Sequence, residues 1–196
     1  MPGQAASTQP ALHPRRSVAR VPGTEDTIVR VLVVADTHLP ASGLDRMPGE
    51  VWELSEAADV ILHAGDVTDQ VVLDALGERA PTHAVLGNND RDLVGAVPDA
   101  RTLDLAGVRI AMVHDSGAAA GRERRMARRF PDADVVIFGH SHQPVAARTG
   151  EGQLLFNPGS PTQRRRQPVH TVGWLELGHG AVLRADIVHV GPLAAT

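Results

Sequence analysis

The segment IVRVLVVADTH, residues 28–38, decides the fold class. Its first eight residues are nearly all apolar and mostly β-branched, which is typical of a strand buried on both faces. Asp36-Thr37-His38 follows where this strand ends. Because ligands of open α/β sheets bind beyond the carboxyl ends of the strands, this segment predicts an α/β protein with polar site residues at 36–38.

The residues that follow repeat the alternation of strand and helix. Helices are predicted over 47–57 and 69–79, and buried strands over 60–62 and 82–86, so the first half indicates a parallel sheet. The second half predicts a hairpin of 101–105 with 108–113 and a basic helix over 121–129. Further, mostly antiparallel strands are predicted over 134–138, 153–156, 171–177 and 181–190. Two sheets packed together, with helices outside, account for both halves.

The composition narrows the classes of function. The chain has 196 residues, of which 42% are hydrophobic, enough for one domain with a core. Its net charge of −4 argues against a protein held to nucleic acid by phosphate contacts, and three Phe, two Trp and no Tyr give few platforms for stacked bases. The absence of cysteine excludes disulfides and thiolate metal sites, which leaves His, Asp, Glu and Asn as strong ligands.

The first 26 residues are rich in Pro, Ala, Ser and Arg. They predict a flexible tail over 1–26 ahead of a domain over 27–196. Arg15-Arg16 is not followed by the apolar stretch of a secretory signal, and no run approaches the ~20 residues that span a bilayer. We therefore expect a cytoplasmic protein without a membrane or nucleic-acid partner; the sequence leaves a homo-oligomer open.

Five strand ends carry side chains of ligand type. They are ADTH (35–38), AGDVTD (64–69), GNND (87–90), VHD (113–115) and GHSH (139–142). Each alone has a plain explanation, such as turn chemistry for Asn88-Asn89 or a buried histidine hydrogen-bonded to backbone for His114. Together they indicate a metal site, because convergent Asp and His groups mark such sites. The two-residue spacing of His140 and His142 repeats that of Asp36 and His38, and an extended chain aims such pairs to one side.

The ordered series D-x-H, G-D-x-x-D, G-N-x-D, a lone His after a strand, and G-H-x-H resembles the calcineurin-like metallophosphoesterase superfamily. Asn157-Pro158-Gly159-Ser160 is similar to the small single-domain bacterial and archaeal phosphodiesterases within it. The resemblance spans roughly residues 28–190 and implies a four-layer α-β-β-α sandwich of two mixed β-sheets flanked by helices.

The resemblance also implies two divalent metal ions. One would be held by Asp36, His38, Asp66 and His142, and the other by Asp66, Asn88, His114 and His140, with Asp66 bridging. Mixed oxygen and nitrogen ligands suit Mn²⁺, our first expectation, or Fe, Zn²⁺ or Ni²⁺, better than Mg²⁺ or Ca²⁺. Since the histidines and Asn88 are neutral, the centre keeps a positive charge that attracts phosphate and offsets charge in the transition state. Asp66, Asn88 and His140 are therefore also the predicted catalytic residues, around a metal-bridging hydroxide that attacks in line.

Supporting roles are predicted for further polar residues. Asp69, Asn89 and Asp90 are expected to orient ligands from behind, with loop or helix capping as the alternative for the two acids. Asn89 occupies the position where many superfamily members carry a histidine, and it is also a candidate substrate contact together with Arg164. A solvated charge run is the alternative for Arg164 and its two arginine neighbours. His63 is read as a core histidine rather than a ligand.

The favoured function is a phosphodiesterase that acts on a small phosphoester. The alternatives are a phosphomonoesterase and a non-catalytic metal-binding scaffold similar to a retromer subunit, since a fold does not determine a function. A nuclease is disfavoured by the small size, the acidic charge balance and the few aromatic residues.

Overall fold

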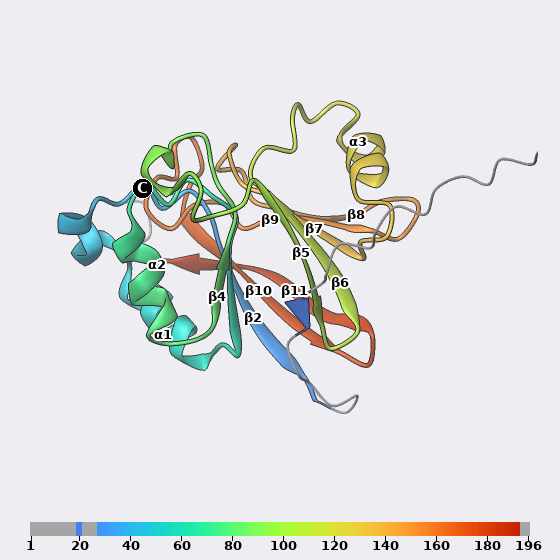
Figure 1. The fold of residues 1–196 in the computed structure, drawn as a ribbon, viewed down its shortest axis with the longest axis horizontal. Coiled ribbons are helices and arrows are strands. Elements are labelled where there is room, and N and C mark those ends of the chain that lie inside the picture. Colours follow the sequence, from blue (N-terminus) through green and yellow to red (C-terminus); the bar gives the residue numbers. More distant parts are fainter. Residues whose placement is uncertain (1–18, 21–26, 193–196) are drawn as a thin grey trace, which may run out of the picture.

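Two β-sheets stack face to face at the centre of the molecule (Figure 1). The computed structural model describes residues 19–20 and 27–192. The five-stranded sheet has the order β11-β10-β2-β3-β4, from Ala181–Val190, His170–Gly178, Val29–Val34, Val60–His63 and Thr82–Ala84. The six-stranded sheet has the order β1-β5-β6-β7-β9-β8, from Ala19–Arg20, Ala100–Leu105, Val108–Val113, Val135–Ile137, Leu154–Asn157 and Val145–Arg148.

Helices cover the outer face of each sheet. Helices α1 (Gly49–Ala57) and α2 (Gln70–Gly77) pack on the five-stranded sheet, and α3 (Arg122–Arg129) packs on the other through Met126. Two short 3-10 helices, η1 (Ala41–Arg46) and η2 (Arg91–Leu93), lie in the connections that follow β2 and β4. The predicted four-layer α-β-β-α sandwich is thus confirmed.

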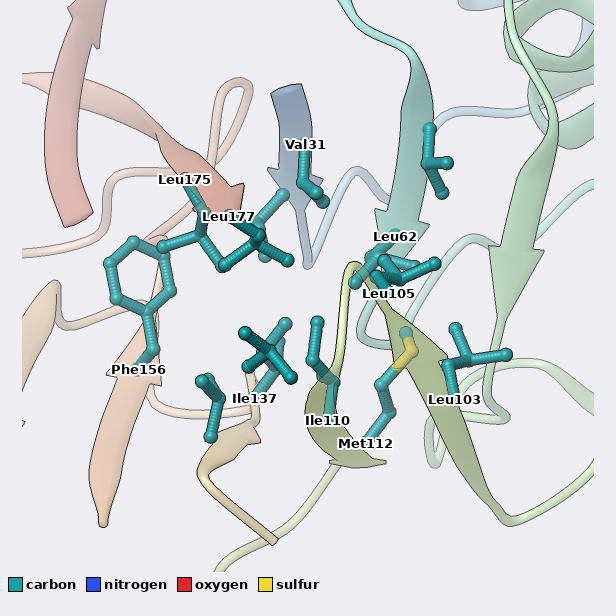
Figure 2. Close-up of a cluster of buried hydrophobic side chains, with 14 of the residues drawn as sticks. Val31, Leu62, Leu103, Leu105, Ile110, Met112, Ile137, Phe156, Leu175 and Leu177 are labelled. Atoms are coloured by element: carbon teal, nitrogen blue, oxygen red, sulfur yellow. The ribbon is translucent and has the colours of Figure 1, made fainter. Parts of the chain in front are cut away.

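Strand β2 explains why its sequence is apolar on both faces. Val31 and Val33 point into the core between the sheets, whereas Leu32 and Val34 pack beneath the helices, and all four are fully buried. Figure 2 shows Val31, Leu62 and Leu175 of one sheet facing Ile110, Ile137 and Phe156 of the other. At roughly 25 cal/mol per Å² of apolar surface, the burial of Val31 and Val33 stabilises the contact between the sheets, and that of Leu32 and Val34 stabilises the contact with the helices.

The arrangement of strands differs from the predicted one in two respects. Strands β10 and β11 come last in the chain yet complete the five-stranded sheet, because β10 pairs antiparallel with β2. In the other sheet β6, β7 and β9 are parallel, so the antiparallel arrangement expected there applies only to its pairs β5–β6 and β8–β9. Strand β8 was not predicted, because Ala146 to Arg148 is an exposed edge without an apolar alternation.

Most of the predicted tail lies outside the described residues. Within it, Ala19–Arg20 forms β1, which pairs parallel with β5. None of the helices in 27–192 combines the length and apolar character that a membrane crossing requires.

Candidate metal centre

The five predicted strand ends converge at one end of the sandwich. Asp36 follows β2 and Asp66 follows β3 in one sheet, whereas His114 follows β6 and His140 follows β7 in the other. The His140 amide donates a hydrogen bond to Asp36 Oδ1 at 3.1 Å, which joins the two sheets at this point. The parallel order of both central strand pairs is what brings carboxyl ends from both sheets together.

One group of possible metal ligands contains Asp36, His38 and His142. Their ligand atoms all lie within 4.8 Å of one another. His142 Nε2 lies 3.4 Å from Asp36 Oδ1 and 3.3 Å from His38 Nε2. The three side chains therefore surround a space of the size that a single cation occupies.

A second group contains Asp36, Asp66 and His114, whose ligand atoms also lie within 4.8 Å of one another. Asp66 Oδ2 is 3.4 Å from His114 Nε2 and 3.5 Å from His38 Nε2, so it contacts one histidine from each predicted metal set. This is the place that a bridging ligand needs. Asp36 belongs to both groups as well, which its sequence context did not indicate.

Asn88 and His140 complete the second set. Asn88 Oδ1 lies 2.9 Å from His140 Nδ1 and 3.2 Å from His114 Nε2. Both Asn88 and His140 are exposed, whereas Asp36, Asp66, His114 and His142 are buried. All seven predicted ligands are thus brought together, with Asn88 and His140 on the solvent side.

The side chains present fit divalent cations. Asp36 Oδ2 is buried and has no hydrogen-bond partner among the described residues. Five of the seven residues also hold the left-handed backbone conformation, with φ of 55° at Asp36, 46° at His38, 56° at Asp66, 67° at His140 and 57° at His142. Since this conformation costs about 1–2 kcal/mol per non-glycine residue, such a concentration of strain marks a site that the surrounding structure is built to hold.

Without bound metal, the environment favours the metal-binding protonation state at some of the candidate ligands and opposes it at others. Burial raises the pKa of Asp36 to about 7, while burial lowers the pKa of His142 to about 4 and that of His38 below its usual value. Burial also opposes the charge on Asp66, but hydrogen bonds from His114 and Asn89 outweigh it and hold the pKa of Asp66 well below its usual range. Burial also lowers the pKa of His114, but its hydrogen bonds to Asp66 and the Ala64 carbonyl outweigh this and hold that pKa above its usual value. Neutral imidazoles and ionised carboxylates are the forms that bind metal, so His38, His142 and Asp66 are prepared for it, whereas Asp36 and His114 must lose a proton when an ion binds.

Asp90 ties the loops after β3 and β4 to each other. Its buried carboxylate accepts three backbone N–H groups, from Asp66 at 2.9 Å, Thr68 at 2.7 Å and Gly87 at 2.7 Å. A side chain at Gly87 would not fit, because its Cβ would lie 2.1 Å from the Asp66 nitrogen. The Asp66 backbone is therefore held from two sides.

Asn89 and Asp69 have different relations to the site. Asn89 donates its amide N–H to Asp66 Oδ1 at 2.9 Å and its side-chain N–H to Asp66 Oδ2 at 2.7 Å. Asp69 instead caps helix α2 by accepting Val71 N–H at 3.1 Å, and it accepts Ala41 N–H at 2.9 Å. The capping alternative thus describes Asp69, whereas Asn89 holds the central carboxylate directly.

The Asn157-Pro158-Gly159-Ser160 loop packs beneath the site. Ser160 Oγ donates to the Asp36 carbonyl at 2.7 Å, and Asn157 Nδ2 donates to the Gly139 carbonyl at 2.8 Å. His142 Nδ1 is hydrogen-bonded to the Gln163 carbonyl, which leaves Nε2 to face the metal position. Nothing in the sequence indicated this role of Gln163, because it is made by a backbone group.

Two further residues are placed by the structure. His63 is fully buried, with Nδ1 accepting the Gly65 N–H at 3.2 Å and Nε2 3.1 Å from Thr37 Oγ1, so it is a core residue. Arg164 is half-buried and donates to the Gln167 carbonyl at 2.6 Å. It is Arg165, one of the two arginine neighbours of Arg164, whose Nη1 reaches toward the site, 3.5 Å from the His140 carbonyl.

Known proteins with a similar sequence carry the same family name. The model of the calcineurin-like phosphoesterase superfamily domain matches residues 29–180. A probable metallophosphoesterase of Methanothermobacter thermautotrophicus is 36% identical over 162 residues, which are 81% of this chain and 91% of that protein.

Solved structures share the fold. Vps29 of Entamoeba histolytica complexed with zinc has a TM-score of 0.61 at 23% identity, over 82% of this chain and 98% of that chain. A structure described as a novel archaeal phosphodiesterase has a TM-score of 0.61 at 21% identity, over 81% of this chain and 99% of that chain. With the matched residues 29–180 including all seven candidate ligands, the chain belongs to the calcineurin-like phosphoesterase superfamily.

Proposed function

We propose that this metallophosphoesterase is a phosphodiesterase that hydrolyses a small phosphodiester with two divalent transition-metal ions, Mn²⁺ before Fe, Zn²⁺ or Ni²⁺. The observation that carries the proposal is the set of seven convergent ligand-type side chains, with Asp66 between the two predicted groups. The archaeal phosphodiesterase of the same fold supports the choice of diesters.

The seven candidate ligands would bind the two ions and set the net charge of the centre. Asp36, His38, Asp66 and His142 would hold one ion, and Asp66, Asn88, His114 and His140 the other. Bound divalent ions supply positive charge for the phosphoryl group and lower the pKa of a water. Asp36 and Asp66 are the only anionic ligands among the seven, so the loaded centre keeps a net positive charge that attracts an anionic ester.

Asn88 and His140 lie on the solvent side of the buried carboxylates, where a substrate arrives. Asn89 orients Asp66 through two hydrogen bonds. Its amide can donate a hydrogen bond to a substrate but cannot act as a general acid at any accessible pH. Either water or another residue therefore protonates the leaving group, or the enzyme favours leaving groups that need little help.

The direct test is hydrolysis by the purified protein supplied with Mn²⁺. We expect metal-dependent cleavage of aryl phosphodiesters that exceeds cleavage of the matching monoesters. If the monoesters are cleaved faster, the enzyme is a phosphomonoesterase instead. Bound metal without turnover of either class would favour a scaffold, the role suggested by the likeness to Vps29.

The missing general acid has a measurable consequence. Across a series of aryl diesters, kcat is expected to fall steeply as the pKa of the leaving phenol rises, because no side chain at position 89 donates a proton. Asn89→His should lessen the slope and raise the rate on the poorest leaving groups by about tenfold or more. Asn89→Gln, which keeps an amide but supplies no proton, is the matched control. A flat dependence in the wild type, with chemistry shown to limit the rate, would contradict this reading.

A further inference from the structure

Arg165 stands at the rim of the metal centre on a loop that is fixed on its inner side. Thr162 Oγ1 donates to the Thr37 carbonyl at 2.5 Å, and Gln163 N–H donates to Ser160 Oγ at 2.9 Å. The Gln163 carbonyl in turn is hydrogen-bonded to His142. The chain is thus attached to both ligand-bearing loops within three residues of Arg165.

The backbone at Arg165 directs its side chain toward the site. Arg165 has a φ of 52°, a left-handed conformation that a non-glycine residue rarely adopts. Its predecessor Arg164 turns away to the Gln167 carbonyl, and the Gln167 N–H donates back to the Arg164 carbonyl at 2.9 Å. The neighbours Arg164 and Arg165 therefore point in different directions, and Arg165 is the one whose side chain lies at His140.

The guanidinium of Arg165 is charged, and most of its N–H groups have no hydrogen-bond partner among the described residues. It is exposed. In the part of the chain that the structure describes, its one hydrogen bond is the long contact of 3.5 Å to the His140 carbonyl, and no carboxylate there forms an ion pair with it. Burial raises the pKa of Asp36 and lowers that of His38 and His142; the positive charge of Arg165 slightly opposes the first shift and adds to the other two, so its field reaches the predicted ligands. A guanidinium with free N–H groups matches the oxygens of a phosphoryl group in pairs.

We infer that Arg165 binds the phosphoryl oxygens of the substrate from the His140 side of the metal centre. This assignment rests on the proposed function and replaces Arg164 as the arginine that contacts substrate. A cation beside a metal site weakens metal binding unless an anion lies between them. The position of Arg165 is thus useful only when a phosphate is bound, which separates its role from that of a residue that merely supports the ligands.

The test uses full-length protein and three variants, Arg165→Ala, Arg165→Lys and the matched control Arg166→Ala, which removes the same charge from the next exposed position. Calorimetry gives the affinity of the Mn²⁺-loaded protein for inorganic phosphate, and a separate titration gives the affinity for Mn²⁺ without phosphate. We expect Arg165→Ala to weaken phosphate binding by about 10- to 100-fold, Arg165→Lys to recover part of the loss, and Arg166→Ala to change it by less than about twofold. The affinity for Mn²⁺ should be unchanged or tighter in Arg165→Ala.

The inference is overturned if Arg165→Ala and Arg166→Ala weaken phosphate binding equally, if Arg165→Ala loses Mn²⁺, or if the loaded wild type binds no phosphate. Steady-state kinetics separate it from the proposed function. A wild type that binds phosphate through Arg165 but cleaves no ester leaves the inference standing and removes the proposed activity. A wild type that cleaves diesters with a KM that Arg165→Ala does not raise leaves the activity standing and removes the inference.

Discussion

Asp66→Asn is expected to lower kcat/KM for an aryl phosphodiester by about 1000-fold or more. Replacing a group that only orients a ligand typically costs 10- to 100-fold, and Asp66 is itself the predicted shared ligand. Its Oδ2 lies 3.5 Å from His38 Nε2 and 3.4 Å from His114 Nε2, so one atom serves both sets. Asparagine keeps the shape but removes the charge, and it can place an N–H where Asn89 now donates to an oxygen.

The measurement combines hydrolysis rates with the metal content of each protein after desalting. Asp59→Asn is the matched control, because Asp59 is exposed and pairs with Arg30 away from the site. The control should retain the metal content and rate of the wild type. An Asp66→Asn protein that keeps two equivalents of metal and hydrolyses within tenfold of the wild type would exclude Asp66 as the shared ligand.

Asp90→Asn is expected to lower the free energy of unfolding of the metal-free protein by about 2–4 kcal/mol. The carboxylate accepts three backbone N–H groups, one buried and two half-buried, and an amide side chain can accept with only one of its two atoms. At least one donor from Asp66, Thr68 or Gly87 then faces an N–H instead of an oxygen. Leaving a buried donor unpaired costs about 1–3 kcal/mol, and losing a charged acceptor weakens the remaining bonds.

Urea denaturation in the presence of a chelator measures this loss without a contribution from bound ions. Asp69→Asn is the comparison, because Asp69 also accepts two backbone N–H groups but caps a helix at a half-buried position. Its loss should be about 1 kcal/mol. Equal losses in the two variants would mean that Asp90 is only another loop cap rather than the tie between the loops of Asp66 and Gly87.

The strands and the places where polar groups follow them could be predicted from the sequence, because both depend on local pattern. The apolar run that becomes β2 ends where Asp36 begins, and the same holds for β6 and His114. The pairing of β10 with β2 could not be predicted in this way, because it joins segments more than 130 residues apart through inter-strand hydrogen bonds that leave no mark in either segment.

The roles of the residues around the metal ligands could be predicted only in part, because they too depend on contacts between distant segments. Asp69 and Asp90 are both acids just beyond an apolar strand, yet one caps a helix and the other holds two loops together. Arg164 and Arg165 are identical neighbours, and only the left-handed backbone at Arg165 decides which side chain faces His140. These roles depend on the backbone conformation and side-chain orientation of each residue, which residue type and spacing do not specify.

The hydrogen bond from the His140 amide to Asp36 has a consequence for the cohesion of the whole molecule. The candidate ligands come from both sheets, so an ion bound among them would cross-link the two sheets. Any motion that slides one sheet over the other would have to break that coordination first. At a free metal concentration 100 times the dissociation constant, binding adds about 2.7 kcal/mol to the stability of the folded chain. The concentration of free metal would then set the free energy of unfolding of the protein, as well as its activity.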